Sequence, residues 1–412
     1  MSKKYKTDKW YTSPWNFLEE ITNQFNFAEN IRLHDVSLRD GEQQAGLIFN
    51  KEQKIAIADR LMEIGVHRIE AGMPAVSKQD EGAIREIVKR SENTNTEVFA
   101  FARCMKEDVK LAADCGVKGI VVEIPSSEHI IQNAYNWPLE RAVEASIEAT
   151  KLAKELGLYT VFFPIDMTRA DIDWVLDLVE DVATNGHMDA LALVDTFGGI
   201  SPHAVPYLVR KAKQRINKPM EAHFHDDFGL GTANTIMALA AGVEVAHTTI
   251  MGIGERAGNV SFEELALSLL TMYDVNLGLK TEKFYELDKY VKDISGLKMK
   301  QNKGIFGENI FDIESGIVTG WYVNARKNHP LELSPYLPEL TGHNNTRIVI
   351  GKHSGLPSIE VWLEIIGVDA TSEQKAEILA KIKDKAYEKE TTLTKEEFIE
   401  IVNKVVSYDR LF

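Results

Sequence analysis

The sequence predicts an α/β protein whose main domain is a closed barrel of eight strand–helix units, followed by a C-terminal helical extension. Two observations predict this class. Short β-rich runs alternate with amphipathic helical stretches from residue 31 onward, and eight such units fit the length of roughly 250 residues that is typical of a (β/α)8 TIM barrel. The alternative is an open, doubly wound parallel sheet, because the sequence does not show whether the sheet closes.

Eight runs have strand character, and each is followed by a helical pattern. They read IRLHDVSL, VHRIEAGMP, EVFAFAR, GIVVEIPSS, YTVFFPID, ALALVDTFG, MEAHFHDD and VAHTTIMGIG. Their near-continuous apolar character indicates parallel strands that are buried on both faces. In KEQKIAIADRLMEIG the apolar residues recur every three or four positions, which is typical of a helix face, and Gly65 closes the helix. Two later helical stretches end in the same way, at Gly157 and Gly242.

The regular alternation ends near residue 280 and gives way to glycine-punctuated, proline-rich and helical segments. Before it, a short helix is expected to begin at Ser13 and Pro14, a favourable N-cap and first helical position. We therefore expect four parts: an N-terminal helical segment at residues 1–30, the catalytic barrel at 31–280, a linker and first subdomain at 281–345, and a helical second subdomain at 346–412.

Composition excludes several classes of protein. The net charge of −15 argues against a nucleic-acid or anionic-membrane partner. No stretch approaches the ~20 apolar residues of a membrane span, and the N-terminus lacks the apolar core of a signal peptide. The two cysteines, Cys104 and Cys115, form neither a disulfide framework nor a CxxC zinc motif, which is typical of a reducing compartment. We expect a cytoplasmic protein.

Polar residues gather where the strands end, and in a barrel of this kind the chemistry lies at the carboxyl ends of the strands. The candidates, in chain order, are Arg39, Asp40, Glu70, Arg103, Ser126, Ser127, His129, Asp166, Arg169, Asp195, Thr196, His223, His225, Asp226 and Asn259. We expect Arg39, Glu70, Arg103, Ser127, Arg169 and Thr196 to bind substrate, and Arg39, His129 and Asp166 to act in catalysis.

The HFHDD motif predicts a metal centre. Residues i and i+2 of a strand point to the same face, so His223 and His225 would both project into the barrel mouth. A carboxylate from another strand would complete a two-histidine, one-carboxylate set with open positions for water or substrate. Asp40 is our candidate for that carboxylate and Asn259 for a fourth ligand. Two separately hydrogen-bonded histidines are the alternative, which the position at a strand end disfavours.

Arg39, beside Asp40, offers a permanently charged donor fork to a ketone oxygen that becomes an alkoxide. A surface ion pair is the alternative for Arg39. Thr196 could donate to a substrate carboxylate, or it could be a helix N-cap. The glycines of GIGERAG do not have the GxGxxG spacing of a dinucleotide fingerprint, although a loop after the eighth strand could contact a phosphorylated cofactor. His247 fits a role in the core better than one in the site.

Together these motifs resemble one family. LRDGEQ, DTFG, HFHDDFGLGTAN, GIGERAGN, GENIFDIESG and GKHSG are similar to those of the DRE-TIM metallolyases, in particular the isopropylmalate, citramalate and homocitrate synthase branch, over about residues 31–360. The resemblance implies a barrel that binds a divalent metal (Mg, Mn or Zn) through Asp40, His223, His225 and Asn259. It implies that Arg39 polarises the ketone of a 2-oxo acid, that Thr196 holds its carboxylate, and that acetyl-CoA is the cosubstrate. It also implies a homodimer.

The chain departs from this family at groups that handle protons. Ile165 stands where a glutamate usually precedes the aspartate of the fifth strand, and Val318 replaces a histidine of the C-terminal subdomain. The histidine that often precedes ESG is replaced by the Asp312–Ile313 stretch. His129, His353, Glu314 and Asp166 are the possible substitutes. The extra regulatory domain of the feedback-inhibited synthases is not expected here.

The sequence is consistent with three functions. The first is a metal-dependent synthase that condenses an acyl-CoA, usually acetyl-CoA, with a 2-oxo acid such as oxaloacetate, pyruvate, 2-oxoisovalerate or 2-oxoglutarate; Arg103 and the SSEH stretch would suit a second carboxylate, as in a citrate synthase. The second is a lyase or aldolase that runs the bond-making step in reverse. The third is a catalytically silent metal-binding paralogue that acts as a regulatory subunit.

Overall fold

The computed structural model describes residues 4–406 and divides the chain into two compact units. One is Pro14–Met299, and the other combines the described residues of Met1–Ser13 with those of Lys300–Phe412. The expected N-terminal segment at 1–30 is therefore shared between the two units, and residues 1–3 and 407–412 of the expected outer parts lie outside the described residues. Among residues 4–406, no helix combines the length and the apolar character that a membrane crossing requires.

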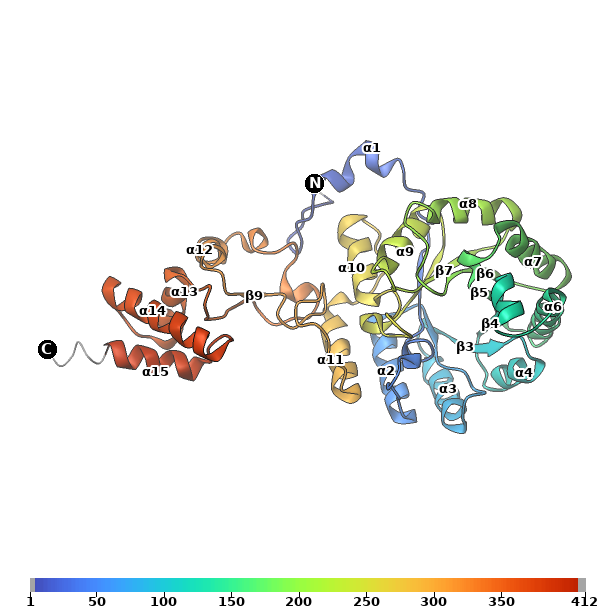
Figure 1. Ribbon diagram of the computed structural model, residues 1–412, viewed down its shortest axis with the longest axis horizontal. Helices are drawn as coiled ribbons and strands as arrows, with labels where there is room; N and C mark the ends of the chain where they lie inside the picture. Colours follow the sequence, from blue (N-terminus) through green and yellow to red (C-terminus); the bar gives the residue numbers. More distant parts are fainter. Residues whose placement is uncertain (1–3, 407–412) are drawn as a thin grey trace. The chain divides into compact units, whose positions relative to one another are not determined.

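The first unit is a closed barrel of eight parallel strands, which confirms the predicted class over the open sheet (Figure 1). The ring closes where the first strand pairs with the last, His34 opposite His247. The strands are β1 (Arg32–Asp35), β2 (Arg68–Glu70), β3 (Glu97–Arg103), β4 (Gly119–Pro125), β5 (Tyr159–Ile165), β6 (Ala190–Asp195), β7 (Met220–Phe224) and β8 (Val245–Thr248). All eight predicted runs contain one of them.

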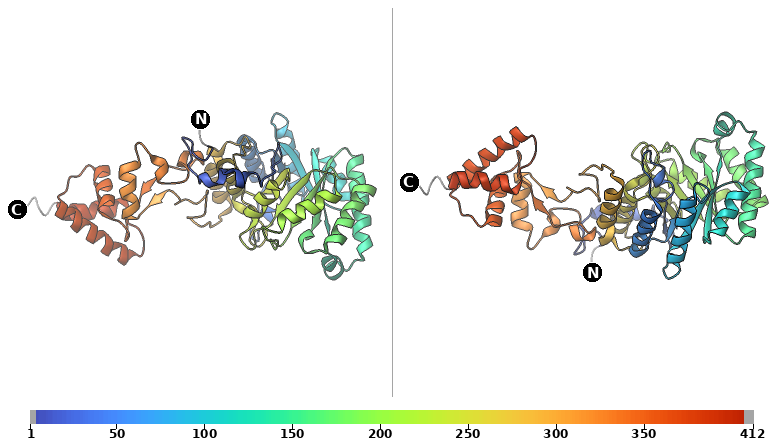
Figure 2. Two further views of the ribbon diagram at one scale, coloured as in Figure 1. Left: turned by 90° about the horizontal axis from the view of Figure 1, so that it is seen from above. Right: turned by 90° about the horizontal axis from the view of Figure 1, so that it is seen from below.

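Helices cover the outside of the strands, as the two further views also show (Figure 2). They are α2 (Lys51–Ile64), α3 (Lys78–Ser91), α4 (Lys106–Asp114), α5 (Glu128–Asn133), α6 (Leu139–Glu155), α7 (Ile172–Asn185), α8 (Val205–Arg215), α9 (Gly231–Ala240), α10 (Phe262–Met272) and α11 (Phe284–Ser295). The ends follow local chemistry: Asn50 and Gln53 form a capping box at the start of α2, and Gly65 adopts the left-handed conformation at its end. Helix α11, expected in the linker, belongs to the barrel unit.

The helix expected to begin at Ser13 and Pro14 is present as two short pieces. A 3-10 turn covers Pro14–Phe17, and a single helical turn, α1, covers Glu19–Thr22. No residue of either element is buried, so neither has an apolar face held against a core. Because helix nucleation is costly, a segment without such packing does not extend into a longer helix.

The interior of the barrel has an apolar side and a polar side. The apolar side comes from β3 to β6 and contains Phe99, Phe101, Val121, Val161, Phe163, Ala190, Ala192 and Val194. Gly119 is required there, since a Cβ at this position would lie 2.3 Å from the ring of Phe99. The other strands contribute buried charged and imidazole side chains, namely His34, Arg68, Glu70, Glu221, His223 and His247. The candidate site lies where these two sides meet.

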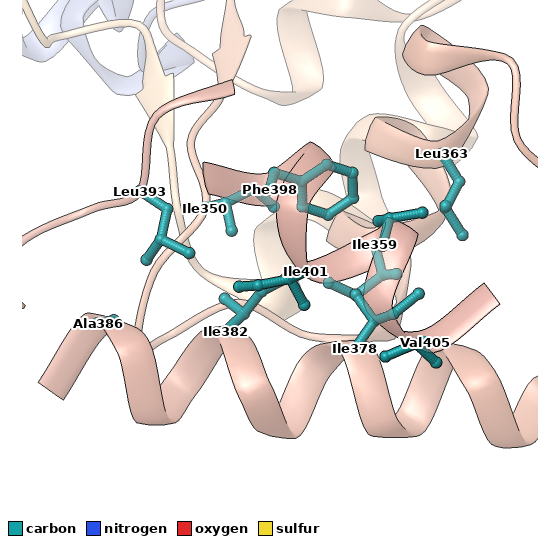
Figure 3. Close-up of a cluster of buried hydrophobic side chains, with 11 residues drawn as sticks. Ile350, Ile359, Leu363, Ile378, Ile382, Ala386, Leu393, Phe398, Ile401 and Val405 are labelled. Atoms are coloured by element: carbon teal, nitrogen blue, oxygen red, sulfur yellow. The ribbon is translucent and has the colours of Figure 1, made fainter. Parts of the chain in front are cut away.

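The second unit contains a two-stranded parallel sheet, β9 (Asp312–Ile313) with β10 (Arg347–Ile348), and the helices α12 (Gly316–Ala325), α13 (Leu356–Ile366), α14 (Ser372–Lys389) and α15 (Lys395–Val406). Figure 3 shows the apolar core that α13, α14 and α15 share, with Phe398 at its centre. The N-terminal residues belong to this unit because Trp10 pairs with Tyr336, and the Leu337 N–H donates to the carbonyl of Lys9.

Two buried carboxyl groups meet between the outer helices of the barrel unit. Asp288 of α11 lies beside Glu263 of α10, and both are almost inaccessible to solvent. Glu263 accepts hydrogen bonds from the Met251 N–H and the Ser261 hydroxyl. Burial, together with the negative charge of Glu263, raises the pKa of Asp288 well above its ordinary value.

We predict that Asp288→Asn stabilises the barrel unit at neutral and alkaline pH. Because folding raises the pKa of Asp288, the folded state keeps a proton that the unfolded chain releases above about pH 4, so stability falls as pH rises. The gain should be on the order of 1 kcal/mol, because one pKa unit corresponds to about 1.4 kcal/mol. Denaturant unfolding from pH 5 to pH 9 measures it, with the exposed Asp293→Asn on the same helix as control. A gain that does not grow with pH would contradict the prediction.

Candidate active site

Three potential metal ligands meet at the carboxyl end of the barrel. Asp40, His223 and His225 are buried, and their ligand atoms all lie within 4.8 Å of one another. The Oδ2 atom of Asp40 is 3.2 Å from Nε2 of His223 and 3.7 Å from Nε2 of His225. The two histidines are alternate residues at the end of β7, and Asp40 lies in the turn after β1. Only β8 separates these two strands in the ring, since it pairs with β1 on one side and with β7 on the other. Two imidazoles and one carboxylate fit a divalent cation with open coordination positions.

The protonation of these groups suits metal binding. Burial lowers the pKa of His223 to about 3, so its imidazole is neutral at physiological pH, as a metal ligand must be. Burial alone would raise the pKa of Asp40, but the charge of Arg39 and the contact with His223 outweigh it and hold this pKa well below its ordinary value. The set therefore offers one negative charge, on Asp40, and at least one neutral imidazole nitrogen, on His223.

Arg39 joins the ligands to the wall of the barrel. Its guanidinium is ion-paired with Glu70 of β2, and its Nη1 lies 3.0 Å from Asp40 Oδ2. The guanidinium carbon lies 3.8 Å from the centre of the Phe101 ring, a cation–π contact that fixes the plane of the fork. Its Nη2 is buried and makes no hydrogen bond among residues 4–406, so one donor remains for a bound oxygen.

A chain of buried contacts continues from His223 through the barrel. Its Nδ1 lies 3.2 Å from Nδ1 of His247, whose Nε2 lies 2.8 Å from the carboxylate of Glu221. Arg68 donates to the other oxygen of Glu221 at 2.7 Å. In the tautomer in which His247 donates to Glu221 from Nε2 and accepts at Nδ1, the donor of the contact between the two Nδ1 atoms is His223. The lone pair of His223 Nε2 then faces Asp40.

His34, Glu221 and His247 also lie within ligand distance of one another, one layer deeper in the barrel. The ring of His34 is fully buried, with Nδ1 3.7 Å from a Glu221 oxygen. The ion pair between Arg68 and Glu221 places a fixed positive charge at this group, which opposes a second cation. We therefore interpret this group as support for the first one.

Asn259 lies beside the three ligands, next to His225 in an isolated backbone bridge. Its amide nitrogen donates to Asp40 Oδ1 at 2.9 Å and to the carbonyl of Ile253 at 3.3 Å. In this orientation Asn259 stabilises the carboxylate of Asp40. Its amide oxygen would have to turn toward the ligands for Asn259 to coordinate an ion itself.

A second polar group forms around Asp166, at the ends of β4, β5 and β6. Arg169 donates to both of its carboxylate oxygens at 2.6 and 3.0 Å, and the Ser127 hydroxyl donates at 2.6 Å. Nε2 of His129 lies 3.5 Å from the same carboxylate, and the Asp166 N–H donates to the Thr196 hydroxyl at 2.8 Å. These five predicted residues lie together.

Arg103 does not join either group. Although it ends β3, its guanidinium is half exposed and forms a two-point ion pair with Asp108 of α4. A cavity of about 560 Å³ opens beside Arg39, between the loop after β1 and the start of α3. Its walls include Glu42, Met73 and the aliphatic part of Lys54, and its size suits a small-molecule ligand.

Sequence reasoning missed His34, Glu221 and Glu123, and for His247 it favoured a role in the core over one in the site. A signal was present for two of them. Glu221 precedes His223 by two residues and so shares its face of β7, and Glu123 is a charged residue inside the apolar run GIVVEIP. Burial raises the pKa of Glu123 to about 7.

The sequence of this chain is similar to those of known proteins. The family model described as HMGL-like matches residues 30–291. The chain is 36% identical to a homocitrate synthase of Methanothermobacter thermautotrophicus over 96% of its own length and 98% of that protein. It is 40% identical to a putative (R)-citramalate synthase of Archaeoglobus fulgidus over 86% of its length and 71% of that protein.

A solved structure has the same fold. The crystal structure of the hydroxymethylglutaryl-CoA (HMG-CoA) lyase of Bacillus subtilis superposes with a TM-score of 0.60, at 22% identity, over 66% of this chain and 96% of that one. At this identity the match supports the fold alone. The family model and the two relatives confirm the resemblance that the motifs indicated, and they show that the chain belongs to the HMGL-like family.

Proposed function

We propose that this protein condenses an acyl-CoA, acetyl-CoA in the first instance, with a 2-oxo acid to give a 2-hydroxy di- or tricarboxylate and free CoA. The observation that carries the proposal is the convergence of Asp40, His223 and His225 beside a guanidinium with an unused donor, Nη2 of Arg39. The homocitrate and citramalate synthases to which the chain is similar support it.

In this mechanism Asp40, His223 and His225 hold a divalent cation, with Asn259 as a further candidate ligand. A divalent cation held by these residues would supply Lewis-acid polarisation of a ketone oxygen. Arg39 donates to the same oxygen from a position that Glu70 and Phe101 hold fixed, so little reorganisation is needed as the charge develops. We assign Thr196 to the acceptor's carboxylate, because its hydroxyl lies at the rim beside Asp166.

The reaction type does not specify which 2-oxo acid is the acceptor, that is, which side chain its ketone carries. The two relatives have names that differ in product although their identities to this chain are similar, so overall identity does not assign the acceptor. Arg103 is engaged by Asp108, which leaves it poorly placed for the second carboxylate of an oxaloacetate or a 2-oxoglutarate. We therefore rank pyruvate and other acceptors without an acidic tail first.

We predict that the metal-loaded protein releases free CoA from acetyl-CoA when one 2-oxo acid of a panel is present. A thiol-reactive dye measures the release against glyoxylate, pyruvate, 2-oxobutyrate, 2-oxoisovalerate, oxaloacetate and 2-oxoglutarate, and mass spectrometry identifies the product. Release that is equal with and without an acceptor would indicate a thioesterase. Failure to release CoA with every acceptor and every metal would contradict the proposed function.

We predict that His225→Ala lowers the content of divalent metal and reduces turnover by at least about 100-fold, because it removes one of three ligands. Metal content after dialysis is measured by elemental analysis with Mg, Mn and Zn supplied separately. The control is His203→Ala, which removes an exposed imidazole of the same barrel unit. Full metal content in His225→Ala would exclude this residue as a ligand.

We predict that His247→Leu weakens metal binding about 10- to 100-fold, the usual effect of removing a partner that orients a metal-binding histidine. Leucine leaves the Nδ1 proton of His223 without an acceptor, whereas the oxygen of Asn in His247→Asn can replace the lost nitrogen. The affinity of His247→Asn should therefore lie between those of the wild type and His247→Leu, measured by metal titration. Equal affinities in all three proteins would contradict the role of His247.

A further inference from the structure

One carboxyl group inside the barrel mouth, that of Glu123, has no hydrogen-bond or ion-pair partner in the described part of the chain. Glu123 lies on β4, two residues after Val121, and therefore on the interior face that Val121 shares with Phe101 and Phe163. In the parallel register Glu123 lies between Arg103 of β3 and Phe163 of β5. Its carboxylate makes no hydrogen bond or ion pair with any side chain or backbone group of residues 4–406.

Every other carboxylate at this end of the interior is engaged. Asp40 and Glu70 bind Arg39, and Asp166 is held by Arg169 and Ser127. Asp195 accepts hydrogen bonds from Thr168 and from two backbone N–H groups. Asp40, Asp166 and Asp195 each accept two or more hydrogen bonds, and Glu70 is held by the Arg39 guanidinium at Oε1, so each of these carboxylates is already committed to a fixed donor.

Glu123 lies on the wall that faces the reacting groups. The ring of Phe163, its neighbour in the register, packs against His223 with centroids 4.9 Å apart, and the guanidinium carbon of Arg39 lies 5.7 Å from its centre. Arg39 and Glu123 are close enough for the charge of each to shift the pKa of the other. A carboxylate here borders the space that a ketone held by Arg39 would occupy.

The charged and titratable groups around Glu123 come from several elements. They are Arg39 in the turn after β1, Glu70 of β2, Arg103 of β3, Cys104 directly after β3, Asp108 of α4 and Tyr135 after α5. Burial raises the pKa of Glu123, the two arginines oppose this, and the two acids reinforce it, which leaves the pKa at about 7. A general base works best when its pKa lies near the working pH, because a large fraction of it is then deprotonated and it still binds a proton strongly.

We propose that Glu123 is the general base that removes a proton from the α-carbon of the acyl thioester. This proposal rests on the proposed function. The carboxylate of Glu123 takes the proton, and the electron pair of the broken C–H bond forms the thioester enolate. The enolate carbon then attacks the ketone carbon of the 2-oxo acid, and the π electrons of the carbonyl move to its oxygen, beside Arg39. Protonated Glu123 or water returns a proton to this oxygen, and water hydrolyses the thioester to a carboxylate and free CoA.

The test compares Glu123→Gln and Glu123→Asp with the wild type and with Glu107→Gln. The last variant removes an exposed carboxylate on nearby α4 and serves as the matched control. Four quantities are measured on the metal-loaded full-length proteins: kcat and KM for CoA release from pH 5.5 to 9, exchange of the acetyl-CoA methyl protons with D2O, metal content, and Tm.

For Glu123→Gln we expect kcat to fall about 10²- to 10⁴-fold, the usual contribution of a general base. The rise of wild-type activity with pH through about 7 should disappear, because only the deprotonated carboxylate accepts a proton. Methyl-proton exchange should be lost, while metal content stays the same and Tm stays equal or rises. Glu123→Asp should keep a weaker pH-dependent activity, and Glu107→Gln should match the wild type.

Three results would overturn the assignment while leaving the proposed function intact. The first is wild-type turnover and exchange in Glu123→Gln. The second is a rise in the acceptor's KM with kcat unchanged, which would make Glu123 a binding residue for the acceptor's tail. The third is a loss of metal from Glu123→Gln. The proposed function fails if the wild type releases no CoA with any acceptor, or if it releases CoA equally with and without one. In either case the role of Glu123 fails with it.

Discussion

The pairing of charges inside the closed barrel is the constraint on which the rest of the structure depends. Arg68 and Glu221, and Arg39 and Glu70, are all buried, and an ionised group in such a place is tolerated only when it is paired and hydrogen-bonded. Removing one member of a buried pair typically costs about 3–5 kcal/mol, because the other charge remains without a partner. These pairs also hold the imidazoles and the guanidinium that face the ligands, so stability and site geometry have the same origin.

The division of the interior into a polar and an apolar side gives the site its character. Arg39 rests on Phe101, and His223 packs on Phe163, so the charged groups have aromatic faces on one side and their ion-pair partners on the other. Aromatic walls exclude water and lower the local dielectric, which strengthens each electrostatic contact made within the mouth. A ketone placed there would experience fixed dipoles and charges in place of mobile solvent.

Much of the fold could be predicted from the sequence, because strand–helix alternation and helix-closing glycines such as Gly65 are local signals. The juxtaposition of Asp40 with His223 and His225 could also be predicted, since all three positions end strands of one barrel. The contact between His247 and His223 could not, because it depends on the register in which β7 pairs with β8, with Ala222 opposite Ala246. The lack of a partner for Glu123 could not be predicted for the same reason. The sequence shows a charged residue inside an apolar strand, but the residues that lie beside it are set by the register of β3, β4 and β5. The division of the N-terminal helix into two short pieces has a different cause, since neither piece has an apolar surface to bury.

The antiparallel pairing of Trp10 with Tyr336 has a practical consequence for anyone who wishes to produce the barrel alone. Because residues 4–13 belong with the C-terminal unit, a fragment designed from the boundaries of the compact units would begin at Pro14 and end at Met299. A truncation made only after residue 299 would remove Pro335, Tyr336 and Leu337, which pair with Lys9, Trp10 and Tyr11, and would expose backbone groups and tryptophan surface that favour self-association during expression.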